Sequence, residues 1–231
     1  MNFGPNDNFL DLTKSFDLNL EKASILQIPI LATRLAVDKS SSMGEEFSSG
    51  WVDYVIQLFL VAAMKFDDDG RLEIGFFNNS LTLVRDMTEK DIKGKTPFTK
   101  AVGQYADGGT RYAPVIEGMA DYDKTFTKLT SLFGKKPKKK GESYLGMITD
   151  GDCSDFNKFE GELRKVTGSF IQVIAIGNQV TLDPLRRLEK ELDYISVIHL
   201  PNPNSVTHEA FFNELCNPKF KTWIDLYCLT N

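Results

Sequence analysis

Apolar and polar residues follow two different periods along this chain, one typical of strands and one typical of helices. Short apolar runs predict buried strands over residues 30–37, 72–77, 144–149, 170–176 and 195–200. A further strand over 81–84 follows the turn Asn78-Asn79-Ser80, so it is expected to form a hairpin with 72–77. Apolar residues three and four positions apart predict helices over 51–66, 113–126, 155–166, 183–192 and, with a break near Pro218, 207–227.

Six strands that alternate with helices predict a doubly wound α/β fold. We expect a mostly parallel six-stranded sheet with one antiparallel edge strand and helices on both faces. The first 28 residues are more polar and less regular, and the alternation over Phe16–Leu20 suggests a short edge strand there. The predicted organisation is therefore an N-terminal extension over 1–28 and one domain over 29–231.

Composition narrows the class of protein. The chain has 231 residues, 42% of them hydrophobic, and a net charge of −5, which fits a single globular domain and argues against binding nucleic acid through overall charge. The three cysteines (Cys153, Cys216 and Cys228) have no close CxxC spacing and are expected to be reduced thiols. With no signal-like start and no bilayer-length apolar run, we expect a cytoplasmic protein without a transmembrane segment.

Hydroxyl and carboxylate side chains collect where the predicted strands end. The first strand runs into Asp38-Lys39-Ser40-Ser41-Ser42, and the strand over 144–149 runs into Asp150-Gly151-Asp152. Between them, Gly108-Gly109-Thr110 immediately precedes a predicted helix. Because ligands bind at the carboxyl ends of strands in open parallel sheets, we expect these three segments to meet at one edge.

An all-oxygen donor set predicts a hard divalent cation, Mg²⁺ first and Mn²⁺ or Ca²⁺ as alternatives. Hydroxyls can bind the ion directly while Asp38 and Asp150 hold its waters, which leaves the ion electrophilic toward an outside acidic ligand. The predicted metal residues are Asp38, Ser40, Ser42, Thr110 and Asp150. Asp152 and Gly109 are candidates for the surroundings of the ion.

These segments resemble the metal-ion-dependent adhesion site (MIDAS) of von Willebrand factor type A (vWA) domains. In that family Asp-x-Ser-x-Ser follows the first strand, a Thr precedes a later helix and an Asp follows the fourth strand, as Asp38, Ser40, Ser42, Thr110 and Asp150 do here. The resemblance covers about residues 29–229. It departs at Ser41, where the family usually has Gly, so the loop conformation is expected to differ slightly.

A narrower resemblance is to the vWA branch of TerF-type tellurium-resistance proteins. It is carried by the stretch from Phe66 to Phe77 (FDDDGRLEIGFF) and by the segment from Gly108 to Ile116 (GGTRYAPVI). The resemblance implies a non-enzymatic, metal-dependent module that binds an acidic group of a partner protein in a tellurium-resistance or stress-response complex. It does not imply an oligomeric state.

Two other functions remain open from the sequence. Mg²⁺ beside aspartates and hydroxyls also suits a phosphoester hydrolase, with Asp38 as an imagined nucleophile, although dehalogenase-type phosphatases have Asp where Ser40 stands. The second alternative is a structural scaffold with a vestigial metal site.

Two further charged segments have a structural and a functional interpretation each. Asp67-Asp68-Asp69-Gly70 does not match an EF-hand loop, and a solvated helix-to-strand turn is favoured over a calcium site. The lysine-rich run Lys135–Lys140 could bind nucleic acid or acidic lipid, but a solvated loop is favoured because no aromatic residues are interleaved.

Overall fold

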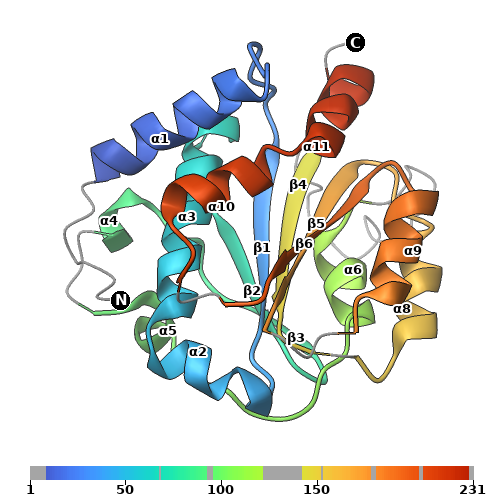
Figure 1. Ribbon diagram of the computed structural model, residues 1–231. Helices are drawn as coiled ribbons and strands as arrows, with labels where there is room; N and C mark the ends of the chain where they lie inside the picture. Colours follow the sequence, from blue (N-terminus) through green and yellow to red (C-terminus); the bar gives the residue numbers. More distant parts are fainter. Residues whose placement is uncertain are drawn as a thin grey trace, which may run out of the picture.

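A six-stranded sheet in the order β3-β2-β1-β4-β5-β6 divides the protein into two helical layers (Figure 1). The computed structural model describes residues 9–67, 69–92, 96–121, 142–151, 153–177, 181–202 and 205–228. The strands are β1 (Ala32–Asp38), β2 (Glu73–Phe77), β3 (Leu81–Leu83), β4 (Ser143–Thr149), β5 (Ser169–Ile176) and β6 (Ile195–Leu200).

Five strands are parallel, and the short edge strand β3 pairs antiparallel with β2. The fold class predicted from the sequence is therefore confirmed. β1 lies between β2 and β4, so the chain leaves β1 toward one side of the sheet and later returns to its other side. The carboxyl ends of β1 and β4 thus form a topological switch point, where open α/β sheets bind ligands.

Alternate residues of the central strands face opposite helical layers, because side chains in a strand point alternately to its two faces. Leu35 and Val37 pack in the larger core, against α3 (Trp51–Phe66), α10 (His208–Leu215) and α11 (Pro218–Trp223). Ala36 packs in the smaller core, against α6 (Ala113–Met119), α8 (Phe156–Leu163) and α9 (Asp183–Glu191). Because both faces are covered, the strands are buried and read as nearly continuous apolar runs.

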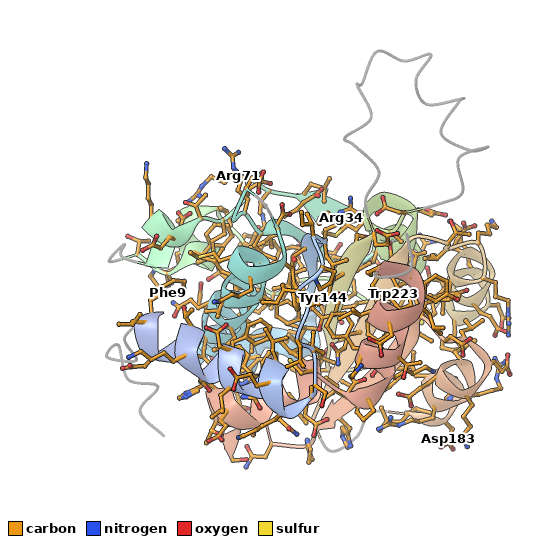
Figure 2. The ribbon with its side chains drawn as sticks, turned by 90° about the horizontal axis from the view of Figure 1, so that it is seen from above. Phe9, Arg34, Arg71, Tyr144, Asp183 and Trp223 are labelled. Atoms are coloured by element: carbon orange, nitrogen blue, oxygen red, sulfur yellow. The ribbon has the colours of Figure 1, made fainter. Side chains whose placement is uncertain are left out.

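Aromatic rings fill much of the larger core. Tyr144 of β4, labelled in Figure 2, is fully buried, and its ring centroid lies 4.7 Å from that of Phe220. The ring of Trp223, also labelled there, lies 6.4 Å from Phe220 and 5.7 Å from Phe170. These contacts attach the C-terminal helices firmly to the sheet.

The N-terminal segment is a helix, α1 (Phe9–Lys22), and the prediction of an irregular segment with an edge strand is wrong. Its buried side chains are Leu12, Phe16, Asn19 and Leu20, which lie on one face of a helix. The ring centroid of Phe16 lies 4.9 Å from that of Phe212 and 5.7 Å from that of Phe66. α1 therefore packs on α10 and α3 as part of the larger core, as Figure 1 shows. The predicted domain boundary near residue 29 stays a prediction.

Other helices differ from the sequence prediction mainly in length. The helix predicted over 113–126 ends at Met119, where the guanidinium of Arg34 binds the Met119 carbonyl at 2.8 Å, and residues 122–126 lie outside the described chain. Short elements that were not predicted are η1 (Ser41–Met43), α2 (Gly44–Ser48), α4 (Glu89–Ile92) and α5 (Phe98–Ala101). The chain ends its described part in a π-helical turn, η4 (Ile224–Cys228).

No single helix in the described ranges has the length and apolar content to cross a membrane. The bent pair Ser41–Ser48 and Trp51–Phe66, which meet at 77°, satisfies both criteria only when its two helices are taken together.

Candidate metal site

The candidate site begins with Asp38, the last residue of β1, whose side chain is fully buried. Its Oδ1 accepts a hydrogen bond from the Ser40 backbone N–H at 2.7 Å, and its Oδ2 accepts one from the Thr149 hydroxyl at 2.7 Å. Thr149 ends β4 and follows Ile148, which pairs with Val37, so the parallel register itself brings the two side chains together. Asp38 is thus held in one orientation by both neighbouring segments.

Two serine hydroxyls connect the ends of β1 and β4. The Oγ atoms of Ser40 and Ser42 lie 3.1 Å apart, and the Ser42 hydroxyl donates to Oδ1 of Asp150 at 3.0 Å. Ser40 is buried, Asp150 is half-buried and Ser42 is exposed, so the oxygens lead from the protein interior to its surface. The structure therefore brings together four of the five residues that the sequence predicts as metal residues.

The fifth, Thr110, lies in a loop that is attached to both of these segments. The backbone N–H and the hydroxyl of Ser41 donate to the Gly108 carbonyl at 3.0 and 3.1 Å. The Thr110 carbonyl accepts from the backbone N–H and hydroxyl of Ser154, in the loop after β4, at 3.0 and 3.1 Å. Among the described residues, no hydrogen bond joins the Thr110 hydroxyl to the serines or aspartates of the site.

Of the two residues expected around the ion, the structure describes Gly109 and leaves Asp152 outside the described residues. Gly109 is exposed in the loop before α6 and lies against the β2–β3 turn, where an added Cβ would come within 3.1 Å of Oδ1 of Asn79. Asp152 lies outside the described residues, as does the lysine-rich run over 135–140. The Asp67–Gly70 segment connects α3 to β2 at the opposite edge of the sheet, with Asp68 also outside the described chain.

The ionised forms of Asp38 and Asp150 are disfavoured at this edge of the sheet. Burial raises the pKa of Asp38 to about 6, against the opposing effect of its hydrogen bonds with Thr149 and Ser40, and the charge of Asp150 raises it further. Burial also raises the pKa of Asp150, and the hydrogen bond from Ser42 opposes this shift. No ion pair to Asp38 or Asp150 exists in the part of the chain that the structure describes. A cation bound here would stabilise the ionised carboxylates.

The structure adds two residues that the sequence prediction missed. Thr149 is one, because its hydroxyl holds Asp38 although it lies inside a strand pattern that reads as apolar. Glu46 of α2 is the other: its Oε2 is buried without a hydrogen-bond partner among the described residues, and its pKa is raised by burial and then by the charges of Asp150 and Glu45. Glu46 follows Ser42 by one helical turn, and this spacing was the available signal.

The donor chemistry fits a hard divalent cation. The described residues contain no group of three or more His, Cys, Asp or Glu side chains with metal-binding geometry, so any ion here depends on hydroxyls as well as carboxylates. Two hydroxyls 3.1 Å apart beside two carboxylates form the oxygen-only set that Mg²⁺, Mn²⁺ or Ca²⁺ accept.

Comparisons with known proteins agree with this fold. A family model described as vWA-TerF-like, the vWA found in the TerF C-terminus, matches residues 31–228. The uncharacterized protein YcbR of Bacillus subtilis (strain 168) is 23% identical over 217 residues, which cover 91% of this chain and 84% of YcbR.

Solved structures give a more distant likeness. A von Willebrand factor type A protein from Catenulispora acidiphila overlaps 81% of this chain with a TM-score of 0.52 and 14% identity, and the chain spans 42% of that protein. Proximal thread matrix protein 1 from the mussel byssus was solved with a zinc-occupied MIDAS motif. Its match covers 87% of this chain and 49% of the mussel protein, with 15% identity and a TM-score of 0.45. At 14% identity, the likeness to the Catenulispora acidiphila protein shows a shared fold alone. By the family model, the chain belongs to the von Willebrand factor type A family, in the branch of vWA domains found at the C-terminus of TerF.

Proposed function

We propose that this chain is a divalent-metal-dependent protein-binding module whose MIDAS-type site consists of Asp38, Ser40, Ser42, Thr110 and Asp150. The observation that carries the proposal is the continuous set of oxygens from buried Asp38 through Ser40 and Ser42 to Asp150, at the switch point of the sheet. vWA domains are in general interaction modules, and membership of that family supports the same conclusion.

Each residue has a distinct task in this proposal. Mg²⁺, or Mn²⁺ or Ca²⁺ in its place, supplies a positive charge that accepts a carboxylate from the partner. Ser40, Ser42 and Thr110 offer hydroxyl oxygens, while Asp38 and Asp150 keep the site negative and orient the groups around it. Asp38 has the most fixed position, since each of its oxygens already accepts a hydrogen bond.

We further propose a cytoplasmic stress-response complex of the tellurium-resistance type as the biological setting. The support for this setting is the family branch, because the matching family model takes its description from TerF. The partner would supply an Asp or Glu side chain or a chain terminus. Nucleic acid is not proposed as a partner, because the net charge of −5 disfavours it.

The geometry favours binding over phosphoester hydrolysis. A nucleophilic Asp38 would need a free oxygen facing solvent, but its side chain is fully buried and both oxygens accept hydrogen bonds. The two cationic side chains nearest the motif in sequence are already paired. Lys39 forms an ion pair with Asp107 at 3.2 Å, and Arg111 forms one with Asp155 at 3.5 Å. Neither is left to clamp a phosphate.

Adjacent serines provide a matched test of the metal site. Ser42→Ala removes a hydroxyl between Ser40 and Asp150, whereas Ser41→Ala removes one that, among the described residues, binds the Gly108 carbonyl alone. In calorimetric titrations with Mg²⁺, we expect Ser42→Ala to bind at least about tenfold more weakly than wild type, the effect of losing roughly 1.4 kcal/mol, and Ser41→Ala to bind like wild type. Equal affinity of all three proteins, or no Mg²⁺ binding by wild type, would contradict the assignment.

Partner capture tests the binding function separately. Wild type and Ser42→Ala are immobilised in parallel and exposed to a cell extract in Mg²⁺. Wild type should retain a partner protein that Ser42→Ala does not retain, and EDTA should release that partner. A partner retained equally by both proteins and in EDTA would favour a scaffold with a vestigial site. Mg²⁺-dependent turnover of phosphoesters that is lost in Asp38→Asn would favour the hydrolase.

A further inference from the structure

A cavity of about 250 Å³ lies beside the candidate metal site. It is lined by the loop after β4, the first turn of α8, and the first turn of α9 with the segment before it, while the residue before α6 forms one side. Its lining residues are Tyr112, Gly151, Cys153, Phe156, Thr181, Pro184 and Leu185. All these segments meet at the carboxyl ends of the strands, the same edge as the site.

The cavity and the site share residues and hydrogen bonds. Gly151, in the cavity wall, directly follows Asp150. The Tyr112 hydroxyl donates to the Gly151 carbonyl and lies 3.2 Å from Oγ1 of Thr149, the hydroxyl that holds Asp38. A ligand in the cavity therefore lies against Tyr112, whose hydroxyl contacts the threonine that holds Asp38.

The cavity wall offers apolar surface. Phe156, Pro184 and Leu185 have no polar side-chain atoms, and Tyr112 presents its ring because its hydroxyl is already bonded. Burial raises the pKa of the Cys153 thiol to about 12, so the thiol is neutral and a weak hydrogen-bonding group.

The size of the cavity restricts its occupant. Small-molecule pockets usually have volumes of roughly 300–1,000 Å³. A cavity of about 250 Å³ is smaller than this range and suits one side chain better than a whole cofactor.

We propose that this cavity receives an apolar side chain of the partner segment whose carboxylate reaches the metal, so that the module recognises an acidic group flanked by a leucine-like group. The inference rests on the proposed function and adds the second half of the recognised ligand. Gly151 lines the cavity and directly follows Asp150. The carboxylate of the partner would therefore lie at Ser42 and Asp150, and its apolar group would lie on the other side of Gly151.

Simple carboxylates test the proposal without a known partner. Acetate carries only the acidic group, whereas 4-methylpentanoate adds a leucine-like chain. In NMR titrations of the Mg²⁺-loaded protein, we expect 4-methylpentanoate to bind about tenfold more tightly than acetate, since burial of one apolar side chain is worth at least that factor.

Filling the cavity should abolish this preference. Cys153→Leu places a larger side chain in the cavity, and Cys228→Leu is the matched control at another half-buried cysteine, in η4. We expect Cys153→Leu to bind acetate and Mg²⁺ like wild type and to bind 4-methylpentanoate no better than acetate. Phe156→Ala removes one wall and should also reduce the preference, which covers the case that Cys153→Leu does not fold.

The other outcomes separate the inference from the function it rests on. Equal affinity of wild type for both carboxylates in Mg²⁺ would overturn the cavity assignment and leave the metal site standing. A preference that persists in EDTA, or in both cavity variants, would also overturn it, because the apolar chain would then bind elsewhere. Absence of Mg²⁺ binding in the preceding titration would show that the proposed function itself fails.

Discussion

Replacing Asp38 by asparagine should stabilise the metal-free protein, although Asp38 is a buried and hydrogen-bonded residue. Asparagine has nearly the same shape and retains an oxygen to accept from the Ser40 N–H. Its amide can donate to the Thr149 hydroxyl, which is able to accept as well as donate. The substitution therefore removes the charge while leaving both contacts possible.

The expected size of the effect follows from the pKa of Asp38, which burial raises from 3.8 to about 6. Each pKa unit corresponds to about 1.36 kcal/mol, so the ionised form destabilises the folded protein by up to about 3 kcal/mol at neutral pH. For a domain of this size, that corresponds to a rise of roughly 6–12 °C in Tm for Asp38→Asn.

The pH dependence has a definite sign. Because the pKa of Asp38 is higher in the folded than in the unfolded protein, the folded protein binds more protons between pH 3.8 and about 6. The contribution of Asp38 therefore lowers the stability of metal-free wild type as the pH rises through this window, and Asp38→Asn lacks this contribution. The advantage of the variant should be largest above pH 6 and should shrink toward pH 4.

Urea unfolding in EDTA across this pH range measures the stability difference between the two proteins and its pH dependence. Added Mg²⁺ should stabilise only wild type, because a ligand that binds the folded state alone adds stability. Asp53→Asn is the control: Asp53 is also buried, but it accepts from the backbone N–H and hydroxyl of Thr99, in the first turn of α5, at 2.9 and 2.7 Å. Its replacement should destabilise the protein by about 1 kcal/mol. A less stable Asp38→Asn at pH 7.5 in EDTA, or a difference that does not change with pH, would refute the reasoning.

Three further substitutions test other parts of the structure. Tyr112→Phe removes the hydroxyl between Thr149 and Gly151 and should lower the free energy of unfolding by about 1–2 kcal/mol, measured in urea, and weaken Mg²⁺ binding in calorimetry. Phe16→Ala should cost about 3–5 kcal/mol, because this ring is 1% exposed; a change below 1 kcal/mol would mean that α1 does not belong to the core. Gly146→Ala should destabilise by about 1–3 kcal/mol, because its Cβ would lie 2.4 Å from the Phe59 ring, and a wild-type melting curve would contradict this packing.

The sequence predicted the sheet well because its strands are buried on both faces and stand out as apolar runs. It failed at α1 because a short segment with Phe16, Leu18 and Leu20 satisfies the period of a strand as well as that of a helix. In the structure Leu18 is 47% exposed, and the helical spacing of Leu12, Phe16 and Leu20 is the one that is buried. Packing on α10 decides between the two periods, and α10 lies nearly two hundred residues away in the chain.

The candidate site was predictable where a motif follows a strand and unpredictable where tertiary packing brings in a partner. Asp38, Ser40 and Ser42 lie within five residues, and topology alone places Asp150 beside them. Thr149 could not be identified in this way, because only the register of β1 and β4 directs its hydroxyl to Asp38.

The site and the stability of the fold are connected through the same carboxylate. The switch point requires β1 and β4 to be neighbours, and this pairing brings Asp150 close enough to Asp38 for its charge to raise the pKa of Asp38. A fold selected for stability alone would place Asn at position 38, since the amide keeps the contacts without the charge. The ionised Asp38 destabilises the metal-free protein by up to about 3 kcal/mol, and a bound cation would offset this cost. The cavity beside Gly151 is connected to the same carboxylate, because Tyr112 lines it and the Tyr112 hydroxyl contacts Thr149, the donor to Asp38.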